Sequence, residues 1–248
     1  MKKWITLLSI PILCVPLLFN LQALEVLKLK VFDSFVQTPD PTGFFVTLDI
    51  TETDVSNAGG WPFPRQDLAR IHNDLIKAGA MGVGWVVAFP EPDRFGGDEV
   101  FATALANSPS VLSMFESNAG MTPPTTGTVI LGDGATGIKA SGVVQNTETL
   151  RTNVSQGIAS ARVDIDNLVR RMPLLMQTDT GWVPAYGTEV LKILSNVDTY
   201  VIRTEQQQIA GIKVPNFGEI ATDGLGRKWV SWVNTPRTTL DDMNVEGK

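Results

Sequence analysis

A run of uncharged, mostly apolar residues near the start of the chain extends from Trp4 to Leu24. At about 1.5 Å per residue, a helix over this run is about 30 Å long, which matches the hydrocarbon thickness of a bilayer. Lys2 and Lys3 precede the run, and this charge bias places the N-terminus in the cytoplasm. The pattern therefore predicts a membrane anchor over residues 1–24, with the remainder of the chain outside the cytoplasm.

A cleaved signal peptide is the alternative interpretation of this run. The apolar region of a signal peptide is shorter, about 7–15 residues, and ends in a small-x-small site. Leu21-Gln22-Ala23 is a poor version of that site, because leucine stands where a small residue is wanted. The length favours a retained anchor, and either segment exports the residues that follow.

Beyond the anchor, the apolar positions predict a helix, a strand, a second helix and a second strand. Glu25–Phe35 continues as a helix, and Phe44–Ile50 is short, apolar and partly β-branched, which is typical of a buried strand. Arg65–Ala78 carries one apolar stripe and ends at Gly79, a plausible C-terminal cap. Gly82–Phe89 is the second buried strand. We expect a βαβ unit in which the two strands pair in parallel through a right-handed crossover.

The rest of the chain predicts an α/β fold with a mixed sheet, in one domain over residues 25–248. Residues 117–155 are rich in Gly, Thr, Ser and Asn, and we expect a long surface segment with one or two short strands. Gly157–Val163 and Leu168–Gln177 are expected to pair as strands. The other predicted elements are the helices Asp98–Asn107 and Ala185–Leu194, and the strands Ser110–Phe115, Tyr200–Thr204, Gly211–Val214 and Lys228–Val233.

Composition excludes several kinds of function. The net charge is −6 without a basic patch, so nucleic acid is not an expected partner, because phosphate binding needs clustered Lys and Arg. Cys14 is the only cysteine and His72 the only histidine, which rules out an internal disulfide and a Cys/His metal site. We expect an apolar core to hold the fold, with no metal and no cofactor. A carboxylate-only metal site stays open but has no spacing signature in the sequence.

Two motifs are better explained by structure than by chemistry. Gly132–Gly137 fits the G-x-G-x-x-G pattern, but no helical stripe follows it to meet a pyrophosphate, so a glycine-rich loop is the better interpretation. His72 has no Ser, Cys or acidic partner at a triad spacing. We expect a histidine at a helix boundary with a hydrogen-bonded ring.

Acidic residues offer the remaining candidate sites. Glu91, Asp93 and Arg94 follow the second strand at its carboxyl end, where open α/β sheets place ligand crevices. Asp164-Ile165-Asp166-Asn167, just before Arg170 and Arg171, is interpreted as a turn stabilised by Asx hydrogen bonds rather than a cation site.

Several segments together resemble the type-two CHASE domain, an extracellular sensory module associated with cyclases and histidine kinases. The most specific of them is Trp61-Pro62-Phe63-Pro64 with the following Arg65, and its spacing to Arg170-Arg171 supports the resemblance. The other segments are Leu24-Glu25, Phe32-Asp33, Asp49-Ile50-Thr51-Glu52, Gly79-Ala80, Phe89-Pro90-Glu91-Pro92-Asp93 and Val169 to Leu174.

The resemblance implies a bacterial receptor in the inner membrane. In such a receptor a periplasmic or extracellular sensor domain is followed by further membrane helices and by a cytoplasmic nucleotide cyclase, diguanylate cyclase or kinase. A homodimer is expected, because such output modules work as dimers, and the stimulus is an unknown small molecule or protein. The expected ligand-binding residues are Glu52, Arg65, Glu91 and Asp93, and no catalytic residue is expected in this chain.

The sequence departs from the family pattern in three positions and at its end. Thr51 and Val86 stand where the family has acids, and Asn167 replaces a glycine, a mild change because asparagine tolerates left-handed backbone geometry. The end at Lys248 resembles the lead-in to the family's last strand. We therefore expect a fragment that lacks this strand and is prone to aggregation or low stability.

Two other functions remain open. One is a free periplasmic small-molecule binding protein, which predicts a cleaved signal peptide. The other is an exported hydrolase built on carboxylates from Glu52, Glu91 or Asp93, which requires two of them to converge in one pocket with pKa values pushed apart.

Overall fold

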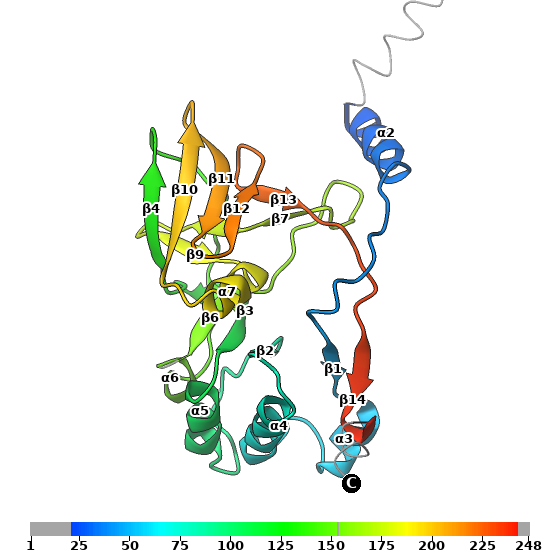
Figure 1. Cartoon of the computed structure of the whole chain (residues 1–248), viewed down its shortest axis with the longest axis vertical. Helices are drawn as coiled ribbons and strands as arrows, with labels where there is room; N and C mark the ends of the chain where they lie inside the picture. Colours follow the sequence, from blue (N-terminus) through cyan, green and yellow to red (C-terminus); the bar gives the residue numbers. More distant parts are fainter. Residues whose placement is uncertain (1–20, 153, 243–248) are drawn as a thin grey trace, which may run out of the picture.

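The computed structural model of the protein describes residues 21–152 and 154–242, and Figure 1 shows the path of the chain. The predicted anchor, residues 1–24, therefore lies almost entirely outside the described residues. Within the described ranges, no helix is long and apolar enough to cross a bilayer.

The helices fall into three places in the molecule. α3 to α6 lie at one end, α7 lies in the middle of the molecule, and α2 lies at the edge (Figure 1). Their bounds are α2 (Leu21–Asp33), α3 (Glu52–Asn57), α4 (Arg65–Lys77), α5 (Asp98–Ala106), α6 (Glu148–Arg151) and α7 (Tyr186–Leu194).

Local sequence explains where α3 and α4 begin and end. Thr51 and Asp54 form a reciprocal capping box at the start of α3, which supplies partners for two otherwise free backbone N–H groups. α4 ends at Lys77 with Ala78 as its C-cap residue, and Gly79 follows with φ +98°, a left-handed conformation that glycine adopts without a steric penalty. The predicted C-terminal cap is thus confirmed at this helix.

The sheet nearest to α4 and α5 is built around a long strand. β3 (Ser110–Met121) pairs in parallel with β2 (Val83–Trp85) and β6 (Ser155–Ile158), and antiparallel with β5 (Val143–Val144). The apolar faces of α4 and α5 pack here into one core with side chains from the sheet. The largest members of this core are Phe63, Leu68, Trp85, Phe89, Phe101, Leu105, Leu112 and Leu150.

A second four-stranded sheet lies at the opposite end, in the order β12-β11-β10-β4. Alternate residues of β10 are buried, as expected for a strand with one face on a core. Its inner face packs into a second core with Leu175 and Trp182. The strands are β4 (Gly127–Leu131), β10 (Thr199–Glu205), β11 (Gln208–Val214) and β12 (Gly218–Ala221).

A buried polar network joins α7 to this sheet. The hydroxyl of Tyr200 donates a hydrogen bond to Oε2 of Glu189 at 2.7 Å, and Nζ of Lys192 lies 2.8 Å from Oε1 of the same carboxylate. Lys192 also donates to the hydroxyl of Thr126 in the segment before β4, at 3.2 Å. Each buried charge here has a partner, which is the condition under which such groups are tolerated in a core.

Three two-stranded pairs complete the fold. β1 runs parallel to β14, whereas β7 with β13 and β8 with β9 are antiparallel. The first pair stands along the edge of the molecule below α2 in Figure 1. The bounds are β1 (Thr47–Asp49), β7 (Arg171–Pro173), β8 (Leu175–Gln177), β9 (Trp182–Pro184), β13 (Arg227–Trp229) and β14 (Arg237–Thr239).

The α/β class is confirmed, but the strands form several sheets and the predicted βαβ unit is wrong in its partners. β1 covers only Thr47–Asp49 of the predicted strand, and it pairs with β14 rather than with β2. β2 pairs in parallel with β3 through α5, so the crossover unit lies one element further along the chain. An apolar run specifies that a strand forms, while its partner depends on contacts far away in the sequence.

Other pairings also differ from expectation. Gly157–Val163 and Leu168–Gln177 do not pair, because β6 joins β3 while β7 and β8 join β13 and β9. The segment 117–155, in which one or two short strands are expected, contains β4 and β5, the end of β3, the first residue of β6 and the unpredicted helix α6. The predicted strand Lys228–Val233 is ordered as a strand only up to Trp229.

Candidate functional site

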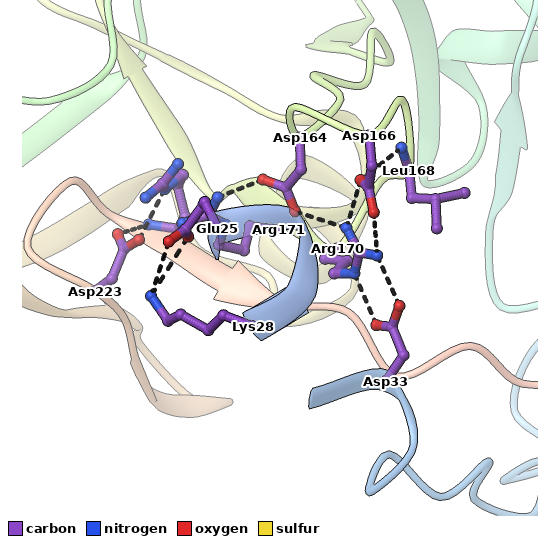
Figure 2. A network of polar contacts seen from close by, with 10 residues as sticks. Glu25, Lys28, Asp33, Asp164, Asp166, Leu168, Arg170, Arg171 and Asp223 are labelled. Carbon is purple, nitrogen blue, oxygen red and sulfur yellow. Dashed lines mark hydrogen bonds and ion pairs between the residues drawn. The ribbon is translucent and has the colours of Figure 1, made fainter. Parts of the chain in front are cut away.

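Arg170 lies directly before β7 and is held by carboxylates from two directions (Figure 2). Asp33, the last residue of α2, accepts from Nε at 2.7 Å and from Nη2 at 2.6 Å. Asp166 accepts from Nη1 and Nη2, both at 2.7 Å. The guanidinium therefore forms two bidentate pairs, which fix orientation as well as distance.

The turn before Arg170 positions Asp164 and Asp166. The backbone N–H of Asp164 donates to the carbonyl of Leu168 at 2.8 Å, and that of Asn167 donates back to the carbonyl of Asp164 at 2.9 Å. Asn167 has φ 63°, a left-handed geometry that asparagine tolerates, as expected at this position. The expected Asx bond exists, since the N–H of Leu168 donates to Asp166 Oδ1 at 3.4 Å, but both carboxylates mainly bind arginine.

Arg171 and an aromatic pair extend the contact between α2 and the body of the protein. Arg171 pairs with Asp164, and its guanidinium lies 5.3 Å from the ring centroid of Trp229 in β13. Phe32 of α2 packs on the same indole, with ring centroids 4.3 Å apart. We call Asp33, Asp164, Asp166, Arg170 and Arg171 the Arg170 cluster.

The charges of the Arg170 cluster stabilise one another. Hydrogen bonding to Arg170 lowers the pKa of Asp166 to about 2 and holds the pKa of Asp33 below its ordinary value. The two carboxylates in turn raise the pKa of Arg170. The Arg170 side chain is only 6% exposed, so a partner is needed to compensate its lost hydration.

This arrangement joins segments and offers no centre for catalysis. Both oxygens of Asp33 and of Asp166 are already occupied by a guanidinium, so neither carboxylate is free to act as a base or ligand. The described ranges contain no group of three or more His, Cys, Asp or Glu side chains that could hold a metal ion. The chemistry of the Arg170 cluster is therefore the attachment of α2 to the body.

Two of the expected ligand-binding residues, Arg65 and Asp93, lie together, with Arg65 buried and Asp93 partly buried. The Arg65 guanidinium lies over the Phe89 ring at 4.3 Å and donates to the carbonyl of Glu91 at 3.4 Å. Asp93 accepts from the backbone N–H groups of Gly97 at 2.9 Å and Arg65 at 3.2 Å. These residues connect the starts of α4 and α5, where negative charge is favoured by the free N–H groups.

The pKa of Asp93 reflects this internal role. Burial raises it, but the backbone N–H donors of Gly97 and Arg65 outweigh burial, and the net pKa lies below the ordinary value. A carboxylate stabilised in its charged form by backbone donors is a poor general acid.

Glu52 and Glu91 do not join this group through their side chains. Glu52 is exposed in the first turn of α3, and Glu91 is exposed and contributes only its carbonyl oxygen. The two described cavities are lined by none of the three carboxylates of the hydrolase hypothesis, Glu52, Glu91 and Asp93. Neither cavity therefore brings together two of the carboxylates that this hypothesis requires.

The segment Trp61-Pro62-Phe63-Pro64 leads into α4. Phe63 is buried in the core beside α4, while Trp61 is about half exposed and meets Phe63 edge-on at 6.4 Å. Arg65 continues the motif as the first residue of the helix. The motif thus fixes how the chain enters α4.

His72 is a buried structural residue in the middle of α4, not at a helix boundary as expected. Its Nδ1 accepts from the indole N–H of Trp85 at 3.2 Å, so Nε2 carries the proton and donates to the hydroxyl of Ser108 at 2.7 Å. Burial lowers the pKa of His72, which keeps the ring neutral. The expected hydrogen-bonded ring is confirmed.

The glycine-rich segment Gly132–Gly137 is a loop after β4, and neither a helix nor a strand follows it directly. The two described cavities are shallow. One of about 390 Å³ lies beside the β10–β11 turn, and one of about 300 Å³ lies between α3, α4 and the C-terminal segment. The second cavity is acidic and is lined by Asp54, Asp67, Asp74 and Asp241 with Arg70.

Comparison with protein families gives a match to the CHASE2 domain over residues 9–244. The match covers nearly the whole sequence, and the chain belongs to this family of sensory extracellular domains. Neither the curated proteins nor the solved structures contain a match. The resemblance to the type-two CHASE domain is thereby confirmed, and a sensory rather than a catalytic role agrees with the geometry described above.

Sequence reasoning found Arg170 and Arg171 as a motif but missed their partners. The segments that resemble the family include both Phe32-Asp33 and Arg170-Arg171. An acid and a base that lie among apolar residues, as Asp33 and Arg170 do, are candidates for an ion pair. Nothing in the spacing of residues so far apart indicated that they meet.

Proposed function

We propose that this chain is the extracytoplasmic signal-sensing domain of a bacterial transmembrane receptor. An N-terminal helix holds it in the inner membrane, and it relays a stimulus to a cytoplasmic cyclase or kinase module outside this chain. The Arg170 cluster carries the proposal, because it attaches α2, the helix that continues from the uncharged N-terminal segment, to the body of a sensory domain.

The relay rests on a two-state arrangement of α2 against the body. A stimulus that binds one arrangement more tightly shifts the population toward it by its differential affinity. The contacts that change are the bidentate pair between Asp33 and Arg170 and the ring contact between Phe32 and Trp229. A homodimer of the receptor is part of the proposal, since cyclases and histidine kinases act as dimers.

The stimulus is a small molecule or a protein that reaches the domain from outside. Among the expected ligand-binding residues, Arg65 and Asp93 are already bound within the protein, whereas Glu52 and Glu91 are exposed. Glu52 and Glu91 are therefore better placed for contact with a stimulus than Arg65 and Asp93 are.

Fractionation of bacteria that express the chain with alkaline phosphatase fused after Lys248 tests export and anchoring together. Because this reporter needs disulfides, it is active only outside the cytoplasm. We expect an active fusion of full mass in the membrane fraction. The matched control replaces Leu13 and Leu17 by arginine, which should abolish insertion and reporter activity.

Other outcomes decide between the alternatives. An active fusion released into the periplasm without its first residues would favour the free binding protein. An inactive fusion in the cytoplasm would contradict both an anchored receptor and a secreted protein.

A further inference from the structure

Helix α2 has two apolar faces, and the body of the protein covers only one. Leu29, Phe32 and Asp33, spaced three and four residues apart, lie on the face toward the body. Leu29 is 3% exposed, Phe32 packs on Trp229, and Asp33 binds Arg170. The body therefore fixes the rotation of α2 about its own axis.

The second face carries an exposed apolar stripe. Leu24, Leu27, Val31 and Phe35 follow one another at intervals of three, four and four residues, the last in the turn that ends the helix. They are 37%, 58%, 50% and 79% exposed. We call these four residues the α2 stripe. A helix that is apolar on two faces is usually covered on both.

Lipid is a poor occupant of this face. Glu25, Lys28 and Lys30 lie in the same turns as the α2 stripe, and Glu25 pairs with Lys28 at 3.3 Å. Charged side chains are unfavourable within hydrocarbon even on the most lenient insertion scale. From Leu27 onward the α2 stripe therefore lies on the water side of the membrane boundary, where an apolar face needs a protein partner.

We propose that α2 packs along this stripe against α2 of a second copy of the chain, as a parallel two-stranded seam. The inference deepens the proposed receptor function, because a common membrane orientation of the anchors places both copies side by side. In this seam Leu24 and Val31 occupy position a of successive heptads, and Leu27 occupies position d. Val31 at the former position and Leu27 at the latter fit the preference for β-branched residues and leucine that favours two parallel strands, whereas Leu24 does not contribute to it. In a dimer with a two-fold axis, the α2 stripe of one copy contacts the same stripe of the other copy.

The extent of the α2 stripe sets the strength of this association. Four partly exposed side chains offer less than the roughly 800 Å² per partner of a stable soluble interface. Association therefore depends on anchoring, which raises the effective concentration of one copy near another.

Disulfide trapping in membranes tests the proposal with the full chain. In a background in which Cys14→Ser removes the only native thiol, single cysteines replace Leu24, Leu27 or Val31. Gln22→Cys is the matched control, because Gln22 is exposed on the opposite face of α2. A disulfide requires Cα atoms about 4.4–6.8 Å apart. With mild oxidant we expect several-fold more dimer at the three stripe positions than at position 22.

Each remaining outcome counts against the seam. Equal cross-linking at position 22, no dimer at any stripe position, or adducts of another mass would overturn it. Leu27→Asp combined with Val31→Cys should lose the dimer while thermal unfolding of the body stays unchanged. Membrane anchoring is measured independently by fractionation. A chain that is anchored but does not cross-link therefore refutes the seam without contradicting the proposed receptor function.

Discussion

Asp33 and Arg170 lie 137 residues apart in sequence, yet their side chains meet through two hydrogen bonds of 2.7 and 2.6 Å. The pair joins the last residue of α2 to the residue before β7. Asp166 binds the other edge of the same guanidinium, so Arg170 keeps a counter-ion even when α2 moves away. This makes the attachment of α2 separable from the stability of the body.

Asp33→Asn should release α2 without unfolding the body. The amide cannot accept both guanidinium hydrogen bonds, while Arg170 remains paired with Asp166. Hydrogen exchange of the α2 amides should accelerate roughly tenfold or more, as expected for a locally opening segment. The melting temperature of the body should change by less than about 2 °C. Glu25→Gln, which removes an exposed ion pair on the same helix, is the control and should leave both readings unchanged.

Acid should weaken the Arg170 cluster within a narrow pH range. The pKa of Asp166 is lowered to about 2 and that of Asp33 is also lowered, so the unfolded chain takes up these protons at higher pH than the folded one. Their contribution to stability is complete above about pH 5 and is lost progressively as the pH falls toward 2. Urea unfolding between pH 6 and 2 should therefore depend less on pH in Asp166→Asn. A slope identical to that of the native chain would contradict this assignment.

His72 should make the protein less stable below about pH 6.5. Its pKa is lowered by burial, so the unfolded chain binds the proton more readily, and the free energy of unfolding falls as the pH drops through the ordinary value. His72→Phe should remove this dependence. It should also cost about 1–3 kcal/mol at pH 8, because the N–H of Trp85 and the hydroxyl of Ser108 lose their partner. Chemical unfolding at pH 5.5 and pH 8 measures both effects.

Substitutions of Glu189 and of Tyr200 in the buried network at α7 should lower the free energy of unfolding by different amounts. Glu189→Gln leaves the buried ammonium of Lys192 without a counter-ion and should cost about 3–5 kcal/mol in unfolding free energy. Tyr200→Phe leaves that ion pair intact and should cost about 1–2 kcal/mol.

The double variant Glu189→Leu with Lys192→Met provides the control for the α7 network. It removes both charges together and should recover part of the loss from Glu189→Gln. Equal destabilisation by the single and double variants would show that packing rather than charge sets the cost.

Periodicity predicted the elements of this fold better than their partners. The stripe of α4 and the cap at Gly79 are local properties, and both were predicted correctly. The pairing of β1 with β14 depends on residues nearly two hundred positions apart, about which local patterns say nothing. Among the expected ligand-binding residues, Arg65 is an example of a motif residue that stabilises the fold.

The predictability of the candidate site follows the same division. The turn before Arg170 could be predicted from Asx chemistry, and the left-handed Asn167 from a glycine replacement. The ion pair between Asp33 and Arg170 could not be predicted, because it joins residues that are far apart in the sequence.

Residues 34–46, between α2 and β1, contain neither helix nor strand. Fully extended, these thirteen residues span at most about 45 Å. Such a segment transmits tension once it is taut, but it transmits no rotation and no compression. If the ion pair opens, α2 can rotate or approach the body without moving β1, and its displacement is limited only by this reach. Mechanical coupling between the N-terminal helix and the body therefore passes through a few side chains and not through the backbone that connects them.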